Sequence, residues 1–86
     1  MKHQIPVFRF TLSPRQSIGP GLLQALWAHA CQSPEVSVGR QLNNRDNQPT
    51  YSLYATQHLQ DLPLVERRLR EALDRHNLRA SLIPVL

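Results

Sequence analysis

The order of secondary-structure patterns along this chain is strand, helix, strand, strand, helix, strand, and this order predicts an α+β fold. Three observations carry the prediction: a strongly amphipathic helix at 61–77, a second apolar helix at 21–31, and four short strand-like runs around them. Two βαβ halves, each with a right-handed crossover, generate a ferredoxin-like βαββαβ sandwich. We therefore expect a four-stranded antiparallel sheet in spatial order 4-1-3-2, with both helices on one face.

The helix expected from Asp61 to Asn77 is the clearest element. Its apolar residues recur at three- and four-residue steps, which is the spacing of one helix face. Asp61 is a good N-cap, Pro63 is tolerated in the first turn, and Asn77 suits the left-handed C-terminal position. A helix of this length is not stable alone, so we expect it to cover a sheet or another helix. The apolar residues are Leu62, Val65, Leu69, Ala72 and Leu73.

The first strand is expected at 6–12, followed by a loop and the first helix. In the strand, Phe8, Phe10 and Leu12 alternate with Val7, Arg9 and Thr11, so the first three are expected to face the core. The loop sequence SPRQSIGPG is rich in Ser, Pro and Gly. The helix at 21–31 ends before Gln32, Ser33 and Pro34. Its expected core residues are Leu22, Leu23, Leu26 and Ala30, with Trp27 beside them.

Two strand-like runs at 36–42 and 50–56 predict an antiparallel hairpin, with the polar sequence NNRDNQP at its tip. Gly39 is expected to mark a β-bulge, because without one Arg40 would share a face with Val36 and Val38. The chain finishes on the apolar sequence LRASLIPVL, which we expect to be an edge strand because Pro84 would interrupt a central ladder.

Composition predicts one domain spanning residues 1–86. Cys31 is the single cysteine, so no internal disulfide forms, and no Cys or His spacing matches a metal site. We therefore expect no cofactor and a reducing, cytoplasmic location. The chain has no long apolar run and no signal-peptide pattern, so we expect no membrane insertion.

The net charge is +4, but it is scattered rather than clustered. The helix at 61–77 holds four Arg and four carboxylates and is neutral. Because the basic residues are dispersed, they are expected to be ordinary solvated surface residues. The alternative is that they form a binding site for an anion or a nucleic acid. The surplus lies on Lys2, Arg9, Arg15, Arg40, Arg45 and Arg79.

The loop at 13–21 is the candidate ligand-binding site. It ends at the N-terminus of a helix, where free amide hydrogens and the positive end of the helix dipole favour an anion. Arg15, Ser17, Gly19 and Gly21 are the candidate ligand-binding residues, and a carboxylate or phosphate is the expected ligand. The alternative is that these Gly and Pro residues serve only to form a tight turn between the strand and the helix.

The sequence IGPGLLQAL after a strand resembles the start of ACT-like regulatory domains, which carry a Pro-Gly-Leu turn at their first helix. Pro20, Gly21 and Leu22 match that turn, and the element order covers almost the whole chain. The sequences LLQAL and YSLYAT are also similar to the cytosolic C-terminal domain of MgtC-like bacterial membrane proteins. Both resemblances imply regulation rather than catalysis, and the second is compatible with this chain being a segment of a larger protein.

The uncovered sheet face is the alternative site, because RNA-recognition domains of this topology stack bases on aromatic residues of the first and third strands. Phe8 and Phe10 are in phase with Leu12, and Tyr51 is in phase with Leu53, so these rings are expected to face the helices. Tyr54 and Arg9 remain for the open face, which is a poor stacking platform. RNA or DNA binding is therefore the alternative function.

The residues that could support catalysis are dispersed. His3, His29, His58 and His76 form no cluster, and His29 and Cys31 lie two apart on a helix, so they do not share a face. Acylphosphatases share the fold and use an arginine in the first loop, but Arg15 lacks the surrounding motif. We expect no enzyme activity.

Self-association is expected from the open sheet face, where Val7, Ile83 and Val85 would form an apolar patch. We therefore expect a homodimer, formed through the sheet face or through an edge strand. The function expected from the sequence is a small, non-catalytic regulatory or interaction module that binds a small anionic ligand or a protein partner and self-associates.

Overall fold

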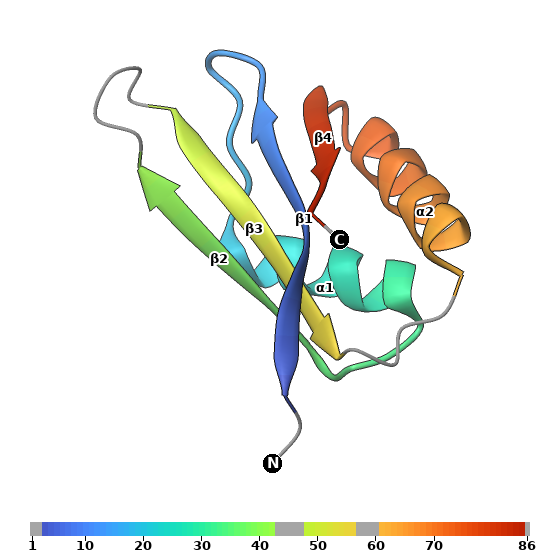
Figure 1. Ribbon diagram of the computed structural model, residues 1–86. Helices are drawn as coiled ribbons and strands as arrows, with labels where there is room; N and C mark the ends of the chain where they lie inside the picture. Colours follow the sequence, from blue (N-terminus) through green and yellow to red (C-terminus); the bar gives the residue numbers. More distant parts are fainter. Residues whose placement is uncertain (1–2, 43–47, 57–60, 86) are drawn as a thin grey trace.

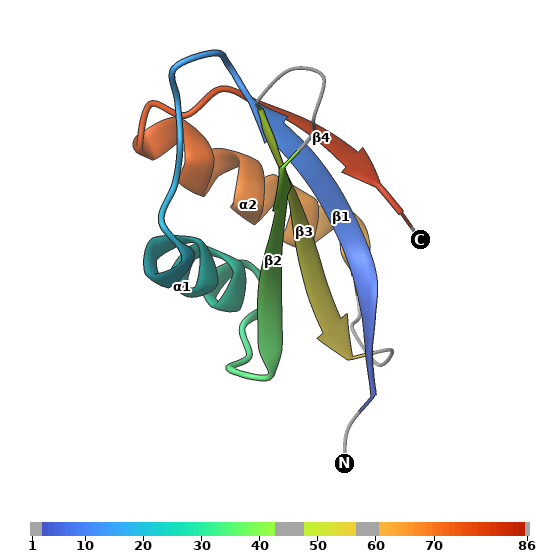
Figure 2. The ribbon, with the colours of Figure 1, turned by 90° about the vertical axis from the view of Figure 1, so that its left-hand side faces the viewer.

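The computed structural model describes residues 3–42, 48–56 and 61–85, and it confirms the predicted element order (Figure 1). The strands form one antiparallel sheet in the order β2-β3-β1-β4, which is the predicted order read from the other edge. Both helices lie on one side of this sheet (Figure 2), so the fold is ferredoxin-like. The elements are β1 (Gln4–Leu12), α1 (Pro20–Cys31), β2 (Val36–Leu42), β3 (Pro49–Thr56), α2 (Leu62–Arg75) and β4 (Ala80–Pro84).

Helix α2 begins and ends where its capping residues predict. The Asp61 carboxylate accepts a hydrogen bond from the Leu64 N–H at 3.4 Å. At the other end Asn77 has φ 57°, and the Leu78 N–H donates to the Leu73 carbonyl at 2.9 Å. This bond closes a Schellman motif, which satisfies carbonyl groups that the last turn leaves free.

The core lies between the sheet and the two helices. Phe8, Phe10 and Tyr51 are buried on the helix side, as their phase in the strands predicts. Trp27 is fully buried, its ring meets Phe8 edge-to-face, and its indole N–H donates to the Tyr54 carbonyl at 2.8 Å. The two helices are tied together by Arg68, whose guanidinium donates to the Ala30 carbonyl at 3.0 Å near the end of α1.

The β-bulge lies in β1 and not at Gly39, so the predicted position was wrong. Pairing between β1 and β3 shifts by one residue between Pro6 and Phe8, which leaves Val7 as the extra residue. Because a bulge resets the alternation of faces, Val7 joins Phe8 among the buried residues instead of lying on the open face. The predicted apolar patch therefore loses Val7, while Ile83 and Val85 are exposed.

Pairing between β2 and β3 runs without a break from Val36 opposite Ala55 to Leu42 opposite Pro49. Arg40 consequently lies on the same sheet face as Val38, on the helix side, and it is exposed there. The tip residues 43–47 of this hairpin are outside the described ranges.

Helix α1 is rotated slightly from the predicted orientation. Leu23, Leu26, Trp27 and Ala30 are buried, but Leu22 is 42% exposed, so its assignment to the core was wrong. The reason is the bulky Trp27, whose burial centres the inward face on Leu23 and Trp27, four residues apart. The Gln24 amide fixes this orientation by donating to the Val36 carbonyl of β2 at 2.6 Å.

Candidate functional site

The first half of the candidate loop is tied to the turn between α2 and β4. Pro14 and Arg15 form a turn in which Arg15 takes a left-handed φ of 72°. The Gln16 side-chain amide then bridges to that turn: it donates to the Asn77 carbonyl at 2.7 Å and accepts from the Arg79 N–H at 2.8 Å. Arg15 thus lies at the part of the loop that contacts residues 77–79.

The second half of the loop lies against the sheet. Ile18 is buried, and its N–H donates to the Tyr51 hydroxyl at 3.3 Å. The Tyr51 ring is stacked on Phe10 with centroids 4.9 Å apart, so the acceptor is held by two central strands. This bond sets the position from which α1 starts.

The N-terminus of α1 has no side-chain cap and no acidic residue in its first turn. Gly19 is the N-cap, Pro20 has no N–H, and the first helical bond runs from the Leu23 N–H to the Gly19 carbonyl at 3.0 Å. The N–H groups of Gly21 and Leu22 therefore have no acceptor within the helix. Gly19 and Gly21 have negative φ, and a Cβ on either would meet nothing within 4 Å, so the space beside both is open.

A cavity of about 140 Å³, which we call the α1–β2 cavity, lies beside this helix start. Its wall is mainly apolar, and the charged side chain among its lining residues is Arg40. A cavity of ~150 Å³ accommodates a molecule the size of benzene. The lining residues are Ile18, Pro20, Leu23, Val38, Gly39, Arg40 and Tyr51.

None of the four predicted site residues is among the described residues that line this cavity. Gly19 and Gly21 flank the lining residue Pro20, whereas Ser17 and Arg15 are exposed on the loop that precedes it. The assignment of these residues to a ligand stays a prediction. Arg40 was not among the candidates, although its place in the alternation of β2 already put it on the helix side. A bulge at Gly39 would have turned Arg40 to the open face, but the pairing there is unbroken.

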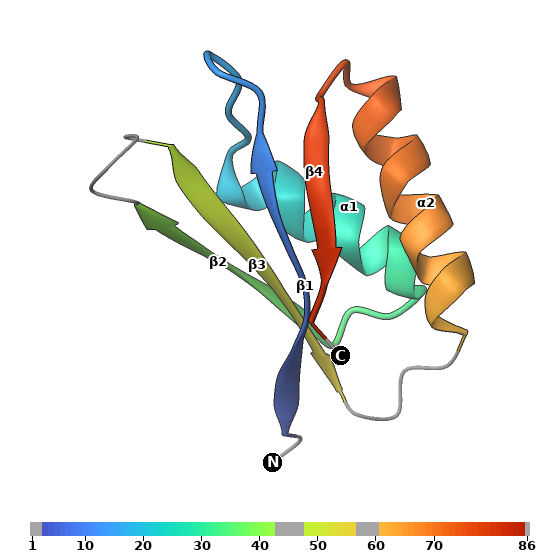
Figure 3. The same ribbon diagram turned by 45° about the horizontal axis from the view of Figure 1, so that its top comes forward.

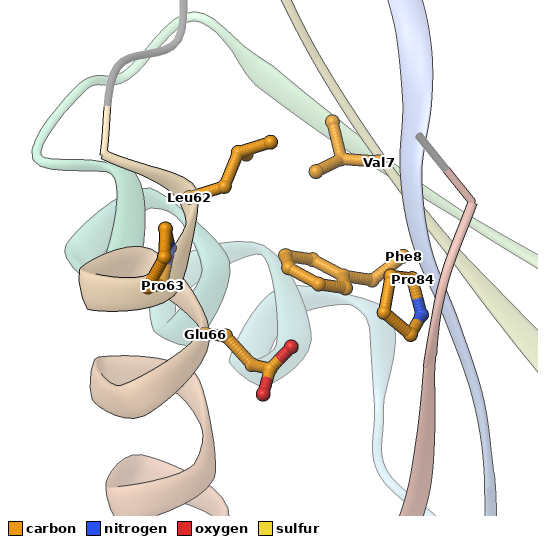
Figure 4. A pocket seen from close by; sticks show the side chains of 6 residues that line it. All are labelled: Val7, Phe8, Leu62, Pro63, Glu66 and Pro84. Carbon is orange, nitrogen blue, oxygen red and sulfur yellow. The ribbon is translucent and has the colours of Figure 1, made fainter.

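A second cavity, of about 290 Å³, lies between the first turn of α2 and the sheet (Figure 4). Leu62 and Val7 face each other across it, Phe8 forms its floor, and the Glu66 carboxylate points toward the space beside Pro84. The Glu66 carboxylate also accepts from Arg70 at 3.2 Å.

Groups suited to catalysis or metal binding are not gathered in the part of the chain that the structure describes. No three His, Cys, Asp or Glu residues lie close enough there to hold a metal ion, and His58 is outside the described ranges. Burial raises the pKa of the Cys31 thiol to about 12, against a smaller opposing effect of Arg68, so the thiol is protonated at neutral pH. Across the described segments no helix combines the length and apolarity needed to cross a bilayer.

In comparisons with protein-family models, curated proteins and solved structures, no match to this chain was found.

Proposed function

We propose that this chain is a non-catalytic regulatory module, ACT-like in its first turn, that binds a small carboxylate in the α1–β2 cavity and self-associates. The observation that carries the proposal is one juxtaposition. An apolar cavity, a permanent cation at Arg40 and the uncapped N-terminus of α1 lie together. The cation and the helix N-terminus favour the carboxylate of a ligand, and the cavity favours its apolar tail.

The carboxylate would accept hydrogen bonds from the Arg40 guanidinium and from the free N–H groups of Gly21 and Leu22. Charge-assisted bonds of this kind are the stronger class of hydrogen bonds in proteins. An apolar tail would contact Leu23 and Val38. The cavity volume of about 140 Å³ limits the tail to a short aliphatic or small aromatic group.

The predicted loop residues complete this proposal. The backbone at Gly19 and Gly21 leaves open space beside the start of α1 and supplies the Gly21 N–H. Ser17 and Arg15 precede this point on the loop, and a ligand would have to extend along the loop to reach them. Arg15 and Arg40 lie on separate elements, so their contributions can be separated by mutation.

The test is a thermal-shift screen followed by an NMR titration. The probes are leucine, its 2-oxo acid and 4-methylpentanoate, with isoamyl alcohol as a matched probe without the carboxylate. A ligand that binds only the native state raises the melting temperature. We expect the acids to raise it and to move the amide signals of 18–23 and 38–40. A screen in which the alcohol works as well as the acids would contradict the charge recognition.

Self-association is proposed along the outer edge of β2. This edge strand contains no proline, and the exposed Leu42 lies on it, with the exposed Leu22 on the neighbouring helix. Joining two β2 edges would bury both leucines and continue the sheet into a second copy. Sedimentation equilibrium of the wild type and Leu22→Lys tests this: we expect a dimer for the wild type and a monomer for the variant. A monomeric wild type would contradict the proposal.

A further inference from the structure

The outer edge of β4 presents free backbone groups. The Ser13 N–H donates to the Arg79 carbonyl and the Val85 N–H donates to the Val7 carbonyl, both at 2.9 Å. Bonds in an antiparallel ladder recur at every second residue, so Ser81 and Ile83 also bond to β1. The backbone groups of Ala80, Leu82 and Pro84 therefore point away from β1, and no described residue pairs with them.

Helix α2 stands beside this edge instead of covering the middle of the sheet. In two views related by a 45° rotation, α2 lies on the outer side of β4 (Figures 1 and 3). Its backbone runs close to α1 and keeps a greater distance from the strands. The helix thus forms one wall of a channel whose other wall is the edge of β4.

This channel, the α2–β4 groove, contains cavities at both ends. The larger, of about 290 Å³, lies between Leu62, Glu66 and Pro84 (Figure 4), and the smaller, of about 100 Å³, lies between Leu73, Asp74 and Leu82. Both lie on the helix side of β4. They are therefore placed to receive alternate side chains of a strand added to that edge.

The larger cavity combines mainly apolar walls with the Glu66 carboxylate, whereas the smaller cavity is lined by both Asp74 and Arg70. Arg70 also pairs with Glu66. The wall of α2 therefore carries a net charge of −1, although the whole chain carries +4. Lysine and arginine combine a long apolar stem with a terminal cation, so they suit the larger cavity, with its apolar wall and the Glu66 carboxylate, in a groove whose helix wall is net negative.

We propose that the α2–β4 groove binds an extended basic peptide segment, which joins the sheet as a fifth strand. Strand addition supplies backbone hydrogen bonds at Ala80 and Leu82, while the two cavities select the side chains. A second copy of this chain does not fit as well. Antiparallel pairing of two β4 edges would bring two α2 helices to the same side of the joint. The site is separate from the α1–β2 cavity, so its failure would leave the proposed ligand site untouched.

The experiment uses a fluorescein-labelled, end-capped octapeptide of alternating lysine and threonine, measured by anisotropy and by amide hydrogen exchange. Comparison peptides replace lysine with glutamate, or carry N-methyl groups on the residues that would bond to β4. Ala80→Pro removes only an outward N–H, and proline is compatible with an edge strand. Glu66→Gln removes one carboxylate without changing the backbone, and Ser81→Ala is the matched control because its N–H bonds inward.

We expect the lysine peptide to slow exchange at the Ala80 and Leu82 amides. Ala80→Pro should weaken binding about fivefold and Glu66→Gln about threefold, whereas Ser81→Ala should change nothing measurable. Equal binding of the glutamate or N-methylated peptide would overturn the proposal. So would protection of Ala80 and Leu82 that grows with protein concentration in the absence of peptide, because a second copy would then occupy the edge.

Discussion

The Tyr51 hydroxyl accepts a hydrogen bond from the Ile18 N–H at 3.3 Å, and this bond joins the central sheet to the loop that starts α1. Tyr51 is itself buried and stacked on Phe10, so the loop is positioned from the centre of the sheet. The position of the α1–β2 cavity therefore depends on a side chain that belongs to the core.

Tyr51→Phe removes this acceptor and keeps the ring stack. Because one neutral hydrogen bond is lost, we expect unfolding in urea to require ~0.5–1.5 kcal/mol less free energy. Amide exchange at Ile18 should become faster while exchange at Leu53 stays slow. An unchanged exchange rate at Ile18 would show that the bond does not hold the loop.

Arg40→Gln tests the cation of the α1–β2 cavity. We expect it to weaken carboxylate binding by ~1.5–3 kcal/mol, which is the range for a hydrogen bond to a charged group. Arg15→Gln is the matched variant, and for a short ligand its effect should be smaller because Arg15 does not line the cavity. Isothermal titration calorimetry with the best acid from the screen measures both. If Arg15→Gln has the larger effect, the charge recognition belongs to the loop instead.

Leu69→Ala tests the packing of α2. Leu69 is fully buried, so the substitution should lower the free energy of unfolding by ~2–5 kcal/mol through lost burial and a residual cavity. Arg67→Ala, on the exposed face of the same helix, serves as the control and should change stability by less than ~0.5 kcal/mol. A loss below ~1 kcal/mol at Leu69 would mean that the helix face is misassigned.

Cys31 predicts a specific alkaline destabilisation. The pKa of its thiol is about 12 in the folded chain against 9.0 for an unperturbed thiol, so between these values the folded state holds the proton more tightly. The contribution of this thiol to the free energy of unfolding is fully present below pH 9 and is lost as the pH rises toward 12. We expect a loss of about 1 kcal/mol between pH 9 and 10 that is absent in Cys31→Ala, measured by urea unfolding. Parallel pH profiles for the two proteins would contradict it.

The open sheet face provides a test of the nucleic-acid alternative. Tyr54 is half-buried there, and Arg9 stands between Ser52 and Ile83 on the neighbouring strands. Because the described part of this face carries one aromatic ring and one cation, affinity for generic single strands at physiological salt should be no tighter than ~0.1 mM. Micromolar binding with a steep salt dependence, measured by anisotropy, would promote RNA or DNA binding to the leading function.

The topology and α2 were predictable because helix period and capping are local properties. Asp61 and Asn77 bracket the helix whatever lies around it. The sheet faces on which Val7 and Arg40 lie were not predictable from the sequence. Which side chains of a strand point to the core depends on its pairing register, and one extra residue in β1 reverses the side on which Val7 lies. Leu22 was wrongly assigned to the core because Leu22 and Leu23 are equally apolar. Only the burial of Trp27 decides which of the two faces the core. The loop of the candidate site could be predicted from its composition. The opposite wall of the cavity, at Val38 and Arg40, could be identified only from the folded hairpin.

The central position of β1 has a consequence for synthesis. Both of its neighbours, β3 and β4, follow it in the sequence, and β4 is the last strand of the sheet. A growing chain therefore carries the aromatic face of Phe8 and Phe10 through most of translation before either edge of β1 can be paired. At ~5–20 residues per second this interval lasts several seconds, which is long compared with the folding of a small domain. During that time both edges of β1 are open to pairing with another molecule.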